Sequence, residues 1–96
     1  MINIDFNLSP EVEEEIAVVT ETEQSSSIIL YNDDYNTFDW VIRSLMTVCN
    51  HDLLQAEQCS MIVHYKGKCS VKEGSPDRLK PLKEALVERG LNATIE

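Results

Sequence analysis

Long hydrophobic runs are missing from this chain of 96 residues. No stretch approaches the roughly 20 apolar residues that a membrane helix requires, and no basic-then-apolar pattern of a signal peptide opens the sequence. We therefore expect a soluble, untargeted protein without a membrane partner. The length predicts one domain with a modest core.

Cysteine is scarce, and its spacing is unsuited to metal or disulfide frameworks. Cys49, Cys59 and Cys69 are an odd number, and no Cys-x-x-Cys pair is present. The sequence therefore predicts no zinc site, no disulfide framework and a reducing, cytoplasmic location. Cys49 and Cys59 fall at apolar helical positions, where a free cysteine serves as a small buried hydrophobe. No Gly-rich phosphate loop occurs, and no cofactor or metal is expected.

Positive charge is also in short supply, and the acidic excess is uneven. The net charge is −9, and residues 1–24 contain seven acidic residues and no Lys or Arg. Residues 25–96 contain ten acidic and eight basic residues, so this part is nearly neutral. Nucleic-acid binding is disfavoured, because it requires a clustered positive face to meet the phosphates.

The first residues differ from the rest in hydrophobic pattern as well as in charge. Alternating apolar residues over 2–8 are typical of one short strand. The acidic and Ser-rich segment that follows has too little apolar surface to offset the entropy of ordering. We predict an acidic, mostly flexible extension over residues 1–26 and a folded domain over residues 27–96.

The folded part alternates between strand and helix patterns. The expected elements are a strand at 28–31, a helix from Asn36 or Thr37 to about 49, a helix after Asp52 ending at Lys66 and Gly67, a strand at 69–71, a helix ending at Gly90 and a strand at 91–95. The order β-α-α-β-α-β predicts an α+β fold, with a three-stranded antiparallel sheet and three helices packed on one face.

Two prolines offer two starting points for the third helix. If the helix starts at Pro76, Pro81 falls inside it and removes one helical hydrogen bond. We therefore predict that the regular helix begins with Pro81 at its first position, where proline costs nothing. Residues 75–80 then form an irregular lead-in.

Acceptor-rich side chains mark a candidate binding site. Asn32, Asp33 and Asp34 lie between the first strand and the first helix, and His64 lies near the end of the second helix. Such a group suits a small cation with several donors, such as a peptide α-ammonium group, and charge-assisted hydrogen bonds contribute about 1.5–3 kcal/mol each. An apolar hole beside them adds roughly 1.5–3 kcal/mol for a buried Leu or Phe. Together they select a free N-terminus with a bulky apolar first residue.

Simpler structural roles are open to the same residues. Asn32 and Asp33 are suited to making the turn, and Asp34 is suited to capping the helix. His64 fits a hydrogen-bonded histidine near a helix end. Phe38 and other apolar residues of the first helix fit an ordinary core.

Enzymatic and metal-binding roles are weaker alternatives. A hydrolase needs Asp34 and His64 beside a nucleophile such as Ser60 or Cys59, but the sequence contains no Ser-His or Cys-His signature. A metal site needs His51 to reach from the interhelical turn toward His64 and the two aspartates. We expect neither.

Two motifs at a fixed separation link the chain to a known family. They are Asn32-Asp33-Asp34-Tyr35 and His64-Tyr65-Lys66-Gly67-Lys68. The chain resembles the ClpS family, the adaptor proteins of ATP-dependent Clp proteases, well over residues 28–72 and more weakly over 75–89. The resemblance implies a fold similar to the C-terminal domain of the ribosomal stalk protein. It also implies an adaptor, not an enzyme, that recognises N-degrons starting with Phe, Leu, Trp or Tyr and delivers them for degradation.

The resemblance also implies a role for each site residue. The residues implied to hold the α-amino group are Asn32, Asp34 and His64, with Asp33 beside them. The residues implied to line the side-chain pocket are Asn36, Phe38, Val41, Ser60 and Val63, with Leu91 as a looser match. Phe38 and Ser60 stand where the family commonly has methionine, so a wider floor behind a stiffer rim is expected, with an altered preference for the first residue.

The implied partners are the N-terminal residues of protein substrates and the N-terminal domain of a Clp-family AAA+ unfoldase, ClpA-like or ClpC-like. The protein itself is expected to be a monomer. Asp77 stands in for an acid of the family's docking segment, whereas Leu82 occupies the position of its lysine. A protein-protein interaction domain of the same fold without N-terminus recognition is the alternative function.

Overall fold

The computed structural model describes residues 25–96, so the predicted strand at residues 2–8 and residues 1–24 of the predicted flexible extension lie outside the described residues. Ser26, the last residue assigned to that extension, is the first residue of a strand. The elements in chain order are β2 (Ser26–Tyr31), α3 (Phe38–Cys49), α4 (Leu53–Lys66), β3 (Lys68–Gly74), α5 (Pro76–Glu88) and β4 (Asn92–Ile95). This order confirms the β-α-α-β-α-β pattern and the predicted α+β fold.

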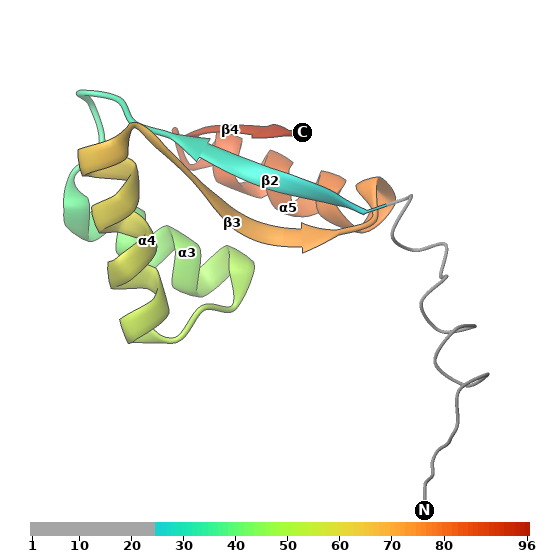
Figure 1. The fold of residues 1–96 in the computed structure, drawn as a ribbon, viewed down its shortest axis with the longest axis horizontal. Helices are drawn as coiled ribbons and strands as arrows, with labels where there is room; N and C mark the ends of the chain where they lie inside the picture. Colours follow the sequence, from blue (N-terminus) through green and yellow to red (C-terminus); the bar gives the residue numbers. More distant parts are fainter. Residues whose placement is uncertain (1–24) are drawn as a thin grey trace, which may run out of the picture.

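The three strands form one antiparallel sheet in the order β3-β2-β4 (Figure 1). Leu30 at the centre of the sheet lies opposite Cys69 on one side and Ala93 on the other. Between β2 and β3 the register shifts after Ile28, so Val71 is the extra residue of a β-bulge. Val71 lies on the core face of β3, as Cys69 two residues before it does, and is 4% exposed.

The helices cover one face of the sheet, and the core lies between the two layers. Ile28 and Leu30 project from the sheet, Leu45 from α3, and Leu79 and Leu86 from α5; all five are at most 1% exposed. The α5 helix runs along the sheet, whereas α3 and α4 pair with one another near the loop that follows β2 (Figure 1). That loop and these two helices surround the cavity described below.

The predicted helix ends are confirmed by their caps. Thr37 accepts a hydrogen bond from the backbone N–H of Trp40 (3.1 Å) at the start of α3. Asp52 accepts one from the N–H of Gln55 (2.8 Å) at the start of α4. Asn50 (φ 61°) and Gly67 (φ 97°) end α3 and α4 in the left-handed conformation.

The prediction for the start of the third helix is wrong. The α5 helix begins at Pro76, and Pro81 lies inside it. Ser75 caps the first turn by accepting a hydrogen bond from the N–H of Arg78 (3.3 Å), and Pro76 occupies the favoured first position. Leu79 is almost fully buried by this turn, so its packing and the cap outweigh the hydrogen bond that Pro81 removes.

Candidate functional site

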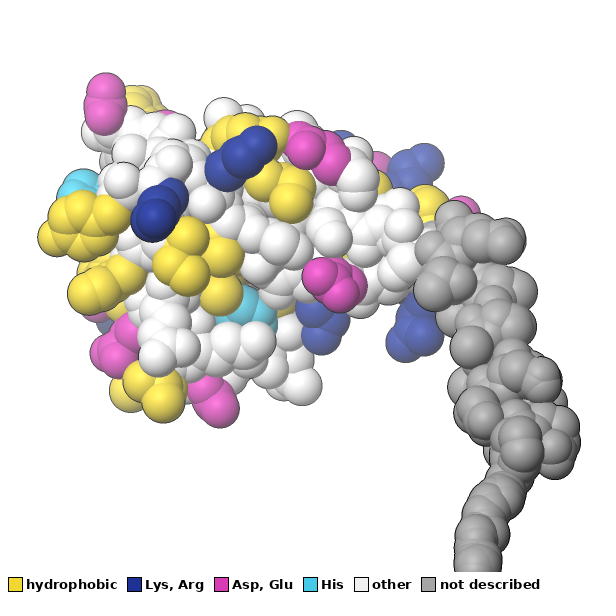
Figure 2. All heavy atoms as spheres, in the orientation of Figure 1, with side chains coloured by type: hydrophobic (Ala, Val, Ile, Leu, Met, Phe, Trp, Pro, Cys, Tyr) yellow, Lys and Arg dark blue, Asp and Glu magenta, His cyan; other side chains and the backbone are white. Residues whose placement is uncertain are grey.

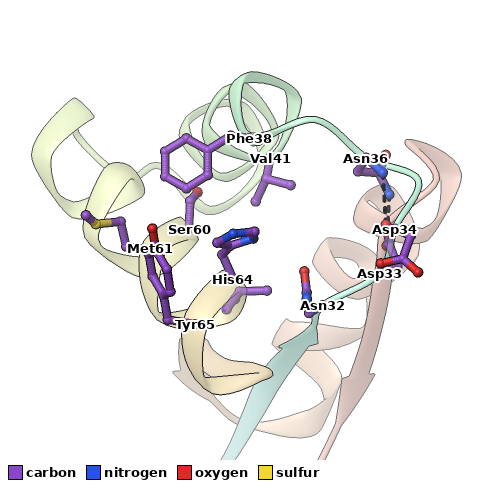
Figure 3. Close-up of a pocket in the computed structure, with 11 residues that line it drawn as sticks. Asn32, Asp33, Asp34, Asn36, Phe38, Val41, Ser60, Met61, His64 and Tyr65 are labelled. Atoms are coloured by element: carbon purple, nitrogen blue, oxygen red, sulfur yellow. Dashed lines mark hydrogen bonds between the residues drawn. The ribbon is translucent and has the colours of Figure 1, made fainter.

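A cavity of about 610 Å³ opens between the loop after β2, the start of α3 and the second half of α4. Its lining contains nine of the ten residues that the sequence suggested for ligand binding: Asn32, Asp33, Asp34, Asn36, Phe38, Val41, Ser60, Val63 and His64. Figure 3 shows most of these side chains directed around one opening. The structure therefore brings together residues that lie up to 32 positions apart in the chain.

The loop after β2 is held in shape by Asp33. One carboxylate oxygen accepts hydrogen bonds from the backbone N–H groups of Tyr35 (2.8 Å) and Asn36 (2.9 Å), and the other accepts from the Asn36 side chain (3.0 Å; Figure 3). The Asn36 amide also donates to the carbonyl of Gly90 (2.9 Å), which ties the loop to the turn before β4. Asp33 and Asn36 thus serve as the internal frame of the site.

The same hydrogen bonds determine the charge state of Asp33. Burial raises the pKa of the carboxyl group, but the donors on Asn36 and Tyr35 outweigh burial, so the net pKa lies below its usual value. Asp33 therefore keeps its negative charge at neutral pH. With Asp34 it gives the lining two carboxylates and no Lys or Arg, which favours a cationic ligand.

Three other polar side chains remain available to a ligand. Within residues 25–96, no hydrogen bond engages the side chains of Asn32, Asp34 or His64. The Asn32 backbone N–H donates to the carbonyl of Gly67 (2.9 Å), which anchors the end of β2 to the end of α4. Figure 3 shows Asn32 and His64 entering the same opening from these two elements. At the acceptor end of the cavity, the backbone is therefore held by a hydrogen bond between two elements, while the side chains of Asn32, Asp34 and His64 are left for a ligand.

Aromatic rings position His64. The rings of His64 and Tyr65 meet edge to face at 4.7 Å between centroids, and those of Phe38 and His64 meet the same way at 6.4 Å. Phe38 is 44% exposed, so it forms the rim of the cavity and not the ordinary core. Hydrophobic side chains gather on the surface at this end of the molecule (Figure 2).

The other end of the cavity is mostly apolar, with the hydroxyl groups of Ser60 and Tyr65 as its polar atoms. Val41 is half-buried and Val63 is buried, and together they provide an aliphatic wall. Ser60 lies on α4 one turn before His64 and is 2% exposed. The cavity thus joins hydrogen-bond acceptors at one end to an apolar wall at the other.

Two lining residues were missed by the sequence analysis, and one predicted residue lines an adjoining cavity. Met61 and Tyr65 line the cavity from α4, and both are exposed on the outer side of the helix. Their spacing of four residues, beside His64, was the available signal. Leu91 lines a smaller adjoining cavity of about 20 Å³, which shares five lining residues with the larger one: Asn32, Asp33, Asn36, Val41 and Val63.

The residues of the metal-binding alternative are dispersed, whereas Asp34, Ser60 and His64 of the enzymatic alternative share the cavity. Within residues 25–96, however, the Ser60 hydroxyl makes no hydrogen bond to His64. His51 is buried, and its Nε2 pairs with the carbonyl of Val71 at 2.7 Å. It lines a different cavity, beside β3. Burial, with the neighbouring Cys69, raises the pKa of the Cys59 thiol to about 12, so the thiolate that a nucleophile requires is not formed at neutral pH.

Asp77 and Leu82, the two residues of α5 that the family resemblance relates to docking, differ in solvent exposure. Asp77 is exposed in the first turn of α5, where it is open to a partner protein. Leu82 is half-buried and packs against the core, so this position offers a partner no charged group. In the described chain, no helix is long and apolar enough to cross a membrane.

Known proteins are similar to this chain in sequence and in architecture. The family model for "ATP-dependent Clp protease adaptor protein ClpS" matches residues 21–94. An adapter protein ClpS of Edwardsiella ictaluri is 37% identical over 70% of this chain, and the match spans 63% of that protein, less than two thirds of its length. One of Corynebacterium aurimucosum is 30% identical over 92% of this chain and 81% of its own. The structure of Agrobacterium tumefaciens ClpS2 bound to L-phenylalaninamide superposes with a TM-score of 0.70 at 25% identity, covering 76% of this chain and 95% of that one.

Proposed function

This chain belongs to the ClpS family of Clp protease adaptor proteins, and from that premise we propose that it captures proteins by a free N-terminal bulky hydrophobic residue and delivers them to a Clp ATPase-protease. The observation that carries the proposal is the cavity with unengaged acceptors at one end and an apolar wall at the other.

The acceptor end suits an α-ammonium group. Such a group has three N–H donors and a positive charge, and Asn32, Asp34 and a neutral His64 together offer three acceptors. An acetylated N-terminus has no charge and keeps only one N–H donor, so discrimination against it is strong. Charge-assisted hydrogen bonds of this kind contribute about 1.5–3 kcal/mol each.

The apolar end suits the first side chain of the peptide. Burying a Leu or Phe side chain against Val41 and Val63 adds roughly 1.5–3 kcal/mol. The ligand of the Agrobacterium protein, L-phenylalaninamide, combines a free amino group with a benzyl side chain. That chemistry matches both ends of the cavity and supports the proposal.

The proposal extends to the partner and the mode of action. The protein works by binding and not by catalysis, as a monomer, and docks on the N-terminal domain of a ClpA-like or ClpC-like unfoldase. Exposed Asp77 is the docking residue, although the half-buried Leu82 makes this contact different from one based on a lysine. Three free thiols are suited to a reducing cytoplasm.

A binding assay with matched peptides tests the proposal. The full chain is titrated against a fluorescent peptide that starts with Phe and against the same peptide acetylated at its N-terminus. We expect binding of the first only, and loss of at least about a hundredfold in affinity in an Asn32→Ala, His64→Ala variant, because two acceptors are removed. Gln58→Ala is the control, since Gln58 is exposed on the same helix and lies outside the cavity lining.

Two outcomes contradict the proposal. Equal binding of the free and acetylated peptides means that the protein does not recognise the α-ammonium group. Binding of neither peptide favours the alternative, a protein-protein interaction domain of the same fold without N-terminus recognition.

A further inference from the structure

Ser60 is a buried polar group whose hydroxyl is unpaired within residues 25–96. Its Oγ has no hydrogen-bond partner in the described part of the chain, residues 25–96, although the residue is 98% buried. A buried hydroxyl without a partner is costly, and most buried polar atoms in proteins are paired. An unpaired group of this kind in the wall of a binding cavity points to a partner supplied by the ligand.

The position of Ser60 indicates which part of the ligand it meets. Ser60 lies on α4 one turn before His64 and lines the same cavity, on the side of Phe38 and away from the loop that holds Asp33 (Figure 3). In a peptide whose amino group lies at Asn32 and His64, the first side chain extends toward Ser60. Most groups at this end are apolar, and the Ser60 hydroxyl, with the phenol of Tyr65 near the opening, is a polar feature that the tip of the side chain meets.

We propose that Ser60 is a specificity-determining residue whose hydroxyl accepts a hydrogen bond from the tip of the first side chain, so that Tyr and Trp are preferred over Phe and Leu. The donor is the phenol O–H of Tyr or the indole N–H of Trp. This inference rests on the proposed function and concerns the same cavity. Phe and Leu fill the space but leave the hydroxyl unpaired, which lowers their affinity.

Access to the hydroxyl depends on Phe38. Ser60 is almost fully covered, whereas Phe38 at the rim is 44% exposed and meets the His64 ring only at 6.4 Å between centroids. Phe38 lies on the same side of the cavity as Ser60 (Figure 3), so turning its ring toward solvent would widen the path to the hydroxyl. An aromatic ligand then packs against the displaced ring.

The test compares peptides that differ by one polar group. Affinities of the full chain are measured for peptides that start with Tyr, Phe or Leu, and for a pair that starts with Trp or with its benzothiophene analogue, which lacks the N–H. One net hydrogen bond corresponds to about a two- to tenfold change in affinity. We expect the Tyr-to-Phe and Trp-to-analogue ratios to fall about fivefold in Ser60→Ala and to be retained in Ser60→Thr, which keeps the hydroxyl.

The outcomes separate this inference from the proposed function. If the free peptides bind but the ratios are the same in the parent protein and Ser60→Ala, the role of Ser60 is wrong while N-terminus recognition stands. If no peptide with a free N-terminus binds, the proposed function itself is contradicted. Thermal unfolding without peptide provides a second readout: Ser60→Ala should be at least as stable as the parent, because it removes an unpaired hydroxyl. A clearly lower melting temperature means that the hydroxyl already has a partner and overturns the inference.

Discussion

Replacing Asn36 by alanine should weaken the fold before it weakens binding. The Asn36 amide donates to the Asp33 carboxylate at 3.0 Å and to the Gly90 carbonyl at 2.9 Å, and so joins the loop after β2 to the turn before β4. A hydrogen bond to a charged group contributes about 1.5–3 kcal/mol, and one to a neutral carbonyl about 0.5–1.5 kcal/mol. Because both bonds lie near the surface, we take the lower ends and expect a loss of about 2 kcal/mol in the free energy of unfolding.

The effect of Asn36→Ala on affinity should be indirect and smaller. The loop that presents Asn32 and Asp34 is then ordered for only part of the time, and the apparent affinity falls by the fraction that remains competent. We expect a three- to tenfold loss for a Phe-starting peptide, measured by fluorescence anisotropy. The loss of stability is measured by urea denaturation of the same sample.

Asp34→Asn is the matched comparison. Asp34 is exposed, and its side chain makes no hydrogen bond within residues 25–96, so its replacement should change the free energy of unfolding by less than about 0.5 kcal/mol. It should still lower the affinity at least tenfold, because one charged acceptor is lost. If Asn36→Ala leaves stability unchanged and lowers affinity as much as Asp34→Asn, then Asn36 contacts the ligand directly and the assignment to the loop frame is wrong.

Two further predictions concern stability. The hydrogen bonds that lower the pKa of Asp33 stabilise the folded state above the unfolded pKa of about 3.9, and this contribution is lost as the pH falls through the lower folded pKa. The stability difference between the parent and Asp33→Asn in urea should therefore be full at pH 7 and shrink below about pH 4; a difference independent of pH contradicts the cause. A chain of residues 25–96 should unfold within about 0.5 kcal/mol of the full chain, since the described core draws on Ile28 to Ala93; a loss above about 2 kcal/mol means that the first residues pack on the domain.

Local chemistry explains why most elements were predictable. Thr37 and Asp52 satisfy the first N–H groups of their helices from within one turn, and Gly67 needs no tertiary partner to adopt a positive φ. The start of α5 was missed because local rules penalise Pro81, whereas the burial of Leu79 that compensates is a tertiary effect. Sequence alone could not weigh the two.

The sequence predicted most of the residues that line the candidate site. It did not predict which of them hold the loop in shape and which are left for a ligand. The two motifs identified Asn32 and His64, and the structure brings them to one cavity. The hydrogen bonds that commit Asp33 to the loop involve Gly90 through Asn36, a contact across 54 positions of the chain. Such a contact leaves no periodic signal in the sequence.

One edge of the sheet, formed by β3, is irregular, and its irregularity affects whether an extended chain can pair with it. The β3 strand has no neighbour on its outer side within the described chain, and an open edge of this kind invites a foreign strand to pair with it. Here His51 occupies the carbonyl of Val71, and the bulge at Val71 interrupts the row of regular pairing positions. Lys68 and Lys72 place charge along the same strand. These features guard the β3 edge against pairing with an extended polypeptide. Under the proposed function, the approach that they leave open is end-on, with the first residue of the polypeptide in the cavity.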